Sequence, residues 1–149
     1  MKILTINLLI TCLTVFLFST TAQARDDRLQ FPIEDLIKLA KDEGKISDDV
    51  KFFFGQQKYG EVEQKFGTFS SNKKTNAFNK SDKQACEWAA LGALASLHDR
   101  AIREGGNAVV EIVSNYKKQE FTSETEYECG AGRIIAGAAL RGKVVKLAD

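Results

Sequence analysis

The sequence predicts an α+β fold of two layers, in which a long helix packs on a mainly antiparallel sheet. A helical pattern with clear start and stop signals runs from about Asp82 to Glu104, and β-favouring segments lie before and after it. Strands on both sides of one long helix are typical of α+β rather than alternating α/β folds. A short N-terminal helix completes the predicted architecture.

The first 24 residues have the pattern of a cleavable signal peptide. Lys2 supplies a positive charge, residues 3–18 are almost wholly apolar, and Ala22-Gln23-Ala24 offers a small-x-small cleavage site. An apolar run of about 16 residues is shorter than the roughly 20 that a transmembrane helix needs. Cys12 follows Thr11, so the small residue that precedes a lipidated cysteine is missing. We therefore expect cleavage near Ala24 and a periplasmic or secreted protein without a stable membrane anchor.

Cleavage would leave residues 25–149 as a single domain, a length that buries most of its apolar surface. The formal net charge of the whole chain is +1, and Lys2 in the leader accounts for this excess. A balanced charge gives no overall attraction to nucleic acid or anionic lipid. We therefore expect no nucleic-acid partner, and an unknown envelope protein or a small ligand is the expected partner.

Export also limits what the cysteines can do. Cys86 and Cys129 are the two cysteines outside the leader, and two cysteines in an exported domain most simply form a disulfide. Such a bond would stabilise the fold by roughly 4 kcal/mol through chain entropy. A pair of free or redox-active thiols is the alternative, although the sequence lacks the Cys-x-x-Cys spacing that lowers a thiol pKa.

The first predicted element after the leader is a short helix that begins at Pro32 and ends at Gly44. Its apolar face carries Ile33, Leu36, Ile37 and Ala40. A helix of this length is stable only when that face is docked. Two β-favouring segments follow at 50–54 and 65–75, and residues 56–64 between them are predicted as loop with at most one helical turn.

The long helix has the clearest boundaries of the predicted elements. Ser81 and Gln84 form an S-x-x-Q capping box at its start, and Gly105-Gly106 ends it. The apolar stripe at helical spacing consists of Trp88, Leu91, Leu94, Ala95, His98 and Ile102. We expect this stripe to cover the sheet. A bond from Cys86 in the first turn to Cys129 would then join the helix to a late strand.

The chain after the helix is predicted to complete the sheet. Within 107–117, Ala108, Val110 and Ile112 alternate with Asn107, Val109 and Glu111, which predicts a strand with two partly apolar faces. Residues 117–124 are predicted as a hairpin connection into strands near 127–131 and 133–147. The glycines expected to mark bulges or bends there are Gly130, Gly132, Gly137 and Gly142.

No catalytic or metal-binding set of residues is predicted. His98, the single histidine of the sequence, follows Cys86 on the same helix by about 18 Å along the axis, which prevents a catalytic pair. Glu124, Glu126 and Glu128 alternate and are expected on the solvent side of a strand rather than in a calcium loop.

A phosphate-binding loop is also excluded. Residues 137–144 match its glycine and lysine spacing, but valine stands where Ser or Thr would hold magnesium. The remaining residues are too few for the helix that must follow such a loop. We therefore expect no cofactor.

One local cluster of positive charge is a candidate binding surface, formed by Lys73, Lys74, Lys80 and Lys83. Phe69 and Phe78 are interleaved with these lysines, a pattern found where proteins contact nucleic acid or anionic lipid. The simpler interpretation is a solvated strand edge, where lysine discourages aggregation.

Four motifs resemble those of a known family. They are Ser71-Asn-Lys-Lys-Thr-Asn-Ala-Phe78, Cys86-Glu-Trp-Ala, Glu104-Gly-Gly-Asn-Ala-Val-Val110 and Tyr127-Glu-Cys-Gly-Ala-Gly132. They resemble a family of small exported bacterial proteins that often carry the label "excinuclease ATPase subunit", and the likeness runs through most of the mature chain. The label implies ATP and DNA, whereas an exported domain of this size meets neither ATP nor chromosomal DNA.

A second, shorter resemblance concerns the end of the long helix. The Gly-x-Asn-Ala-Val-Val segment at 105–110 is similar to part of the small α/β domain of the Rcs envelope-stress lipoprotein and of YbjQ-like domains. The chain lacks the lipobox and the four-cysteine pattern of the stress sensor, so its signalling role is not implied.

The sequence thus predicts an exported, disulfide-stabilised domain that acts as a non-catalytic binding or interaction module of the cell envelope. A periplasmic enzyme whose site is assembled from distant residues is an alternative, which a pocket holding groups of shifted pKa would favour. A nucleic-acid-associated protein, as the family label says, is another, which binding of single-stranded DNA at low salt would favour.

Overall fold

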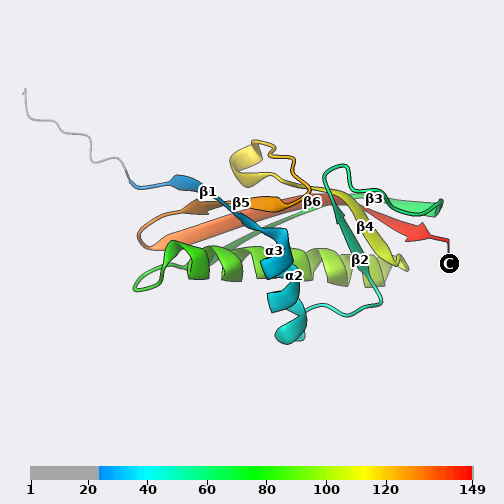
Figure 1. Cartoon of the computed structure of the whole chain (residues 1–149), viewed down its shortest axis with the longest axis horizontal. Coiled ribbons are helices and arrows are strands. Elements are labelled where there is room, and N and C mark those ends of the chain that lie inside the picture. The colour runs from blue at the N-terminus through cyan, green and yellow to red at the C-terminus, as the bar shows by residue number, and fades with distance from the viewer. Residues whose placement is uncertain (1–23, 149) are drawn as a thin grey trace, which may run out of the picture.

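The structure is a computed structural model that describes residues 24–148 (Figure 1). The predicted signal peptide, apart from Ala24, lies outside the described residues. Within them no helix is long and apolar enough to cross a membrane.

The described chain has an α+β fold, with α3 packed across a mainly antiparallel six-stranded sheet (Figure 1). The elements are β1 (Asp27–Pro32), α2 (Ile33–Asp42), β2 (Lys51–Phe54), β3 (Val62–Asn76), α3 (Asp82–Glu104), β4 (Ala108–Ser114), η2 (Tyr116–Lys118), β5 (Glu126–Ala131) and β6 (Ile135–Leu147). The predicted fold class is therefore confirmed.

β6 is the strand on which the sheet is organised. β3 runs antiparallel along the whole of one edge of β6. Along the other edge, β5 pairs with Ala136 and Gly137, and β4 pairs further on, from Leu140 to Val145. β1 adds antiparallel to β5, and β2 adds parallel to β4. The sheet therefore forks into a β5–β1 arm and a β4–β2 arm, which share one edge of β6 (Figure 1).

This fork contradicts the hairpin predicted between the strands on either side of 117–124. β4 and β5 follow one another along β6 instead of pairing along their lengths, because β4 already occupies the edge from Leu140 onward. The contacts between the two segments are local. Ser114 pairs with Phe121 in an isolated bridge, and the Ser114 hydroxyl accepts a hydrogen bond from the Glu128 N–H at 2.8 Å.

The predicted bounds of α3 are confirmed. The Ser81 hydroxyl accepts a hydrogen bond from the Gln84 N–H at 3.1 Å, and Gly105 ends the helix in the left-handed region with φ +83°. The predicted apolar stripe is wrong at its margins, since Trp88 is 39% exposed and Ile102 is 49% exposed. The buried side is instead rich in alanine, at positions 85, 89, 90, 93 and 101. Small side chains let the helix approach the sheet closely, and Trp88 and Ile102 lie at the edge of the contact.

α2 occupies the segment in which the sequence indicates a helix from Pro32 to Gly44. Its Leu36 and Ala40 are fully buried in the core that α3 also enters. β1, which precedes α2, was not predicted. Leu29 and Phe31 alternate there with polar residues and pack against the same core, so a period-two signal was present in the sequence.

Candidate functional site

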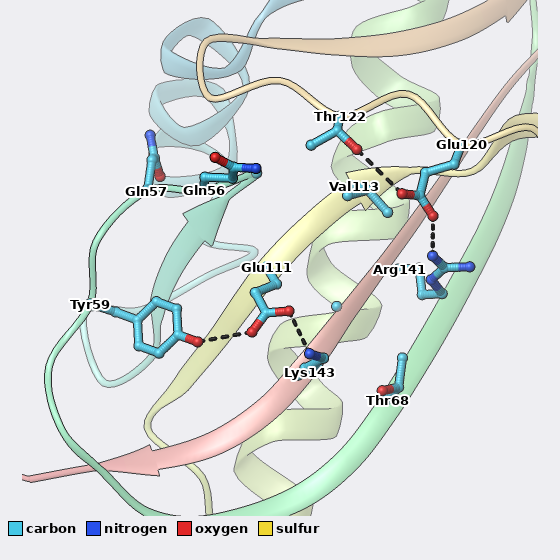
Figure 2. A pocket seen from close by; sticks show the side chains of 12 residues that line it. Gln56, Gln57, Tyr59, Thr68, Glu111, Val113, Glu120, Thr122, Arg141 and Lys143 are labelled. Atoms are coloured by element: carbon cyan, nitrogen blue, oxygen red, sulfur yellow. Dashed lines mark hydrogen bonds and ion pairs between the residues drawn. The ribbon is translucent and has the colours of Figure 1, made fainter.

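A polar groove of about 600 Å³ lies on the face of the sheet opposite α3 (Figure 2). Four parts of the chain line it: the β2–β3 connection, β3, β4 with the segment after η2, and β6. The lining residues are Gly55, Gln56, Gln57, Tyr59, Thr68, Glu111, Val113, Glu120, Thr122, Arg141, Gly142 and Lys143. β6 supplies Arg141 and Lys143, which lie two residues apart and therefore on one face of the strand.

A β-bulge in β4 places Glu111 in this groove. Val110 pairs with Lys143 and Val113 pairs with Arg141, so β4 has one residue more than β6 between the two pairs. Glu111 takes up the extra residue in the left-handed region, with φ +51°. The alternation predicted for this strand is therefore wrong beyond Val110. Ile112 joins Val109 in the core under α3, and Glu111 is turned to the open face.

Glu111 is the centre of one polar cluster. The Tyr59 hydroxyl donates a hydrogen bond to its Oε1 at 2.9 Å, and Lys143 forms an ion pair with its Oε2 (Figure 2). The Tyr59 ring is held in turn by the Phe53 ring, with a distance of 5.8 Å between the ring centroids. The cluster thus joins the β2–β3 connection to β4 and β6.

A second cluster lies further along the groove. Arg141 forms an ion pair with Glu120, and the Thr122 hydroxyl donates a hydrogen bond to Glu120 Oε1 at 3.3 Å (Figure 2). The four charged side chains of the two clusters are between 38% and 50% exposed. Each of them is therefore accessible to a ligand from the open face.

The pKa shifts in the groove stabilise its charged groups. The hydrogen bond from Lys143, followed by that from Tyr59, lowers the pKa of Glu111 below its ordinary value. The same contacts with Glu111 raise the pKa values of Lys143 and Tyr59 above their ordinary values. All three shifts move away from neutral pH, whereas a general acid or base is most effective with a pKa near the working pH.

The wall of the groove is held by contacts between the β2–β3 connection and the segment before β5. The Gln57 side chain accepts a hydrogen bond from the Phe54 N–H at 2.8 Å and donates one to the Glu124 carbonyl at 2.9 Å. Gly55 has φ +56°, and a Cβ there would lie 2.9 Å from the Ser123 carbonyl oxygen. Only glycine allows this close approach, so the wall depends on Gly55.

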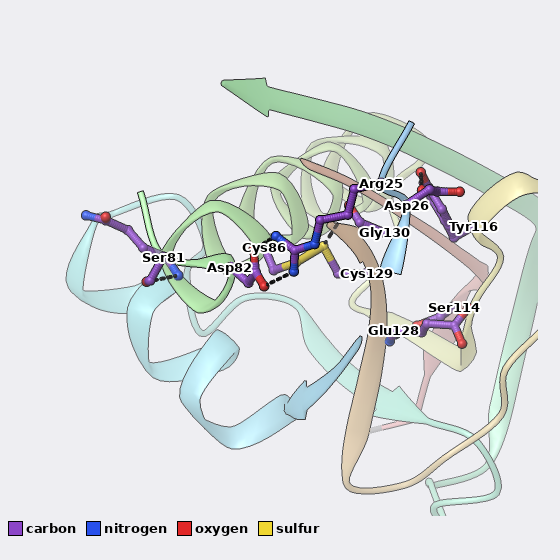
Figure 3. Close-up of a disulfide and its surroundings, with 11 residues drawn as sticks. Arg25, Asp26, Ser81, Asp82, Cys86, Ser114, Tyr116, Glu128, Cys129 and Gly130 are labelled. Atoms are coloured by element: carbon purple, nitrogen blue, oxygen red, sulfur yellow. Dashed lines mark hydrogen bonds and ion pairs between the residues drawn. A yellow bond between two sulfur atoms is a disulfide. The ribbon is translucent and has the colours of Figure 1, made fainter. Parts of the chain in front are cut away.

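The predicted disulfide is present on the other side of the sheet. Cys86 of α3 and Cys129 of β5 are bonded, with a Cα–Cα distance of 5.8 Å and a sequence separation of 43 (Figure 3). Both cysteines are fully buried. Beside the bond, Arg25 forms ion pairs with Asp27 and with Asp82 in the first turn of α3. The start of the described chain, the helix and the β5–β1 arm are thus joined at one place.

The four lysines of the predicted binding surface do not gather in one place. Lys73 lies against Gly92 of α3, whereas Lys74 lies over Gly137 on the opposite face of β3. Lys80 donates a hydrogen bond to the Asn76 carbonyl at 2.9 Å. Lys83 is paired with two carboxylates, Asp35 and Glu87, which balance its charge. Lys74 and Lys80 are therefore the pair whose charges face solvent near the end of β3.

The other residues that the sequence analysis considered make contacts within the fold. His98 Nε2 accepts a hydrogen bond from the Ser47 N–H at 3.1 Å, and its ring stacks on Phe52. Residues 137–144, which match a phosphate-loop spacing, lie inside β6. Glu128 is not on a solvent-facing side: it is 6% exposed and pairs with Arg28 at 2.8 Å. Across residues 24–148, no group of three or more His, Cys, Asp or Glu side chains is placed to hold a metal ion.

The sequence did not predict the groove. A weak signal for it was the alternation of Arg141 and Lys143 within an otherwise apolar strand. Another was the charge of Glu111 between two apolar pairs. Nothing local shows that the bulge brings these groups together, because it depends on the register between β4 and β6. Comparisons of this chain with protein-family models, with curated proteins and with solved structures found no match.

Proposed function

We propose that this protein is a non-catalytic binding module of the cell envelope and that it takes a small polar ligand in the groove on the open face of its sheet. The ligand is one that carries both an acidic and a basic group, such as a short peptide with free termini. The proposal includes export through the N-terminal signal sequence. The buried disulfide is compatible with an oxidising compartment outside the cytoplasm.

The charge pattern of the groove supports a ligand with both charges. Its two clusters each hold one carboxylate and one cation, contributed by β4 or the segment after η2 and by β6. Ion pairs of groups that are this exposed contribute little to stability. Arg141 and Glu111 can therefore exchange their present partners for the carboxylate and ammonium groups of a ligand at small cost.

The left-handed backbone at Glu111 is the observation that carries the proposal. A non-glycine residue in this region costs on the order of 1–3 kcal/mol, and such strain concentrates at binding and active sites. Here the strained residue is the one whose side chain meets Tyr59 and Lys143 in the groove. If the bulge served only to shift the register of the strands, glycine or asparagine at this position would cause less backbone strain.

The pKa shifts favour binding over acid–base catalysis. Glu111 stays ionised, and Tyr59 and Lys143 stay protonated, over a wider range of pH than in isolated residues. Such groups are fixed donors and acceptors for a ligand, and they are poorly suited to exchange protons near neutral pH.

The test is a nuclear magnetic resonance titration of the exported protein with L-alanyl-L-alanine, compared with its N-acetylated amide, which carries neither charge. Amide shifts are expected for Tyr59, Thr68, Val113 and Thr122 with the charged dipeptide alone. Arg141→Ala should abolish them. Lys38→Ala, which removes an exposed ion pair with Asp42 on α2, should leave them unchanged. Equal shifts with both dipeptides, or shifts that persist in Arg141→Ala, would contradict the proposal.

A further inference from the structure

Three large apolar side chains are exposed together at one end of the molecule. Phe78 is 61% exposed, Ile134 is 67% exposed and Ile135 is 53% exposed. Phe78 belongs to the loop before α3, Ile134 belongs to the β5–β6 turn, and Ile135 is the first residue of β6. These two segments lie at the same end of the fold (Figure 1), and all three side chains line one shallow surface. We refer to these three residues as the apolar tip.

The apolar tip has a fixed shape. The Ala77 N–H donates a hydrogen bond to the Ile134 carbonyl at 2.7 Å, and Asn76 pairs with Ile135 at the end of the β3–β6 ladder. The Asn76 side chain also accepts a hydrogen bond from the Phe78 N–H at 2.8 Å. Hydrogen bonds therefore join the two segments, and an ordered backbone carries the exposed side chains.

Positive charge surrounds the apolar tip. Lys74 lines the same shallow surface, Lys80 follows Phe78 by two residues, and Arg133 immediately precedes Ile134. All three are exposed, and none of them forms an ion pair with another described residue. The nearby acidic side chain of Asp82 is already paired with Arg25. We refer to Lys74, Lys80 and Arg133 as the basic rim.

We propose that the apolar tip and its basic rim dock this protein reversibly on the surface of an anionic lipid bilayer. The three side chains enter the boundary between headgroups and acyl chains, and the three cations contact the lipid phosphates. The three side chains are more than half exposed around one shallow surface, which suits a deformable surface better than a folded partner.

The charge of the rim further favours a bilayer as the partner. The three cations of the rim carry one sign of charge, so the rim complements an anionic surface and not a neutral one. This proposal is independent of the groove, which lies elsewhere on the sheet.

The test is co-sedimentation of the exported protein with phosphatidylglycerol-containing vesicles and with pure phosphatidylcholine vesicles. Binding is expected to the anionic vesicles and to weaken as salt is added. Phe78→Ser with Ile134→Ser should reduce the partition coefficient by about tenfold or more, since both changes remove apolar area that the bilayer buries on binding. Lys80→Gln with Arg133→Gln should reduce it by a similar factor and remove most of the salt dependence.

Matched control variants distinguish binding through the apolar tip and basic rim from nonspecific binding to vesicles. Ile102→Ser removes an exposed apolar side chain of α3, and Lys38→Gln removes an exposed cation of α2, and both should bind vesicles as the unaltered protein does. Circular dichroism establishes that each variant is folded. Absence of vesicle binding overturns the proposal. Equal binding of the protein to both vesicle types overturns it as well, and so does binding of the tip variants that equals that of the unaltered protein. Single-stranded DNA binding or self-association through the tip, without vesicle binding, also overturns it.

Discussion

At the scale of single residues, Glu111 shows how a local backbone feature determines which face of a sheet carries charge. Had β4 and β6 paired without a bulge, this carboxylate would have pointed towards α3 and the core. A buried, unpaired carboxylate is strongly unfavourable. The bulge instead brings it to Tyr59 and Lys143 on the open face, at the cost of one strained backbone position.

The pH dependence of this contact gives a first prediction. Lys143 and Tyr59 lower the pKa of Glu111 below its ordinary value of 4.5. The stabilisation is therefore complete above about pH 4.5 and is lost as the pH falls through the lowered pKa. Glu111→Gln should reduce the free energy of unfolding by about 1 kcal/mol at pH 7, since the pair is solvent-screened. Urea unfolding at decreasing pH should show this difference disappear below the lowered pKa.

A matched control for this prediction is Glu61→Gln, because Glu61 is exposed and its side chain has no ion pair within residues 24–148. Its effect on stability should be small at every pH. A Glu111→Gln effect that stays constant down to the most acidic condition would show that charge pairing is not its cause.

At the scale of elements, the β5–β1 arm is fixed to β6 by Tyr116 of η2. The Tyr116 ring lies over two glycines, Gly130 of β5 and Gly137 of β6. Its hydroxyl donates a hydrogen bond to Asp26 at 2.8 Å, and the Arg28 guanidinium lies 5.6 Å from the ring centroid. Burial, followed by the hydrogen bond to Asp26, raises the pKa of Tyr116 to about 12. The glycines predicted as bends thus serve here as space for an aromatic ring.

This packing predicts that Gly130→Ala is strongly destabilising. A Cβ at Gly130 would lie 2.1 Å from Tyr116 Cζ, and the contacts of the ring with Asp26 and Arg28 oppose its displacement. We expect a loss of about 3 kcal/mol in the free energy of unfolding, measured in urea. Gly60→Ala, which meets no atom within 4 Å, should change the stability little.

A double-mutant cycle tests the cause of the Gly130→Ala effect. If the ring is responsible, adding Gly130→Ala to Tyr116→Ala should cost much less than adding it to the unaltered protein. Additive losses would place the clash elsewhere.

Elements whose signals are local in the chain were predictable from the sequence. Ser81 and Gly105 fix the ends of α3 through hydrogen bonds and dihedral angles within a few residues. The relation of β4 to β5 was not predictable, because both compete for the same edge of β6 and the sequence does not say which part each obtains. The groove depends on that outcome, since β4, β6 and the segment after η2 together supply most of its lining.

At the scale of the whole molecule, the Cys86–Cys129 bond joins the helix layer to one arm of the forked sheet. Its pairing was predicted from the expected compartment and the number of cysteines, without knowledge of the fold. The bond closes a loop with a sequence separation of 43, whose ends are otherwise free to separate in the unfolded chain.

Reduction of this bond is expected to lower the free energy of unfolding by about 4 kcal/mol, because the unfolded chain regains the entropy of the open loop. Urea unfolding with and without reductant measures the difference. The Cys86→Ala, Cys129→Ala double variant should match the reduced protein and should not respond to reductant. A reductant effect of the same size in that variant would assign the loss to another cause.

The position of β6 has a consequence for the order in which the sheet can form. Residues 135–147 follow β3, β4 and β5 in the chain, yet all three strands pair with them. A ribosome therefore makes β6 after its partners. Until β6 emerges, the earlier strands have no partner along these edges. The order of the strands thus delays completion of the sheet until the strand that they share has been made.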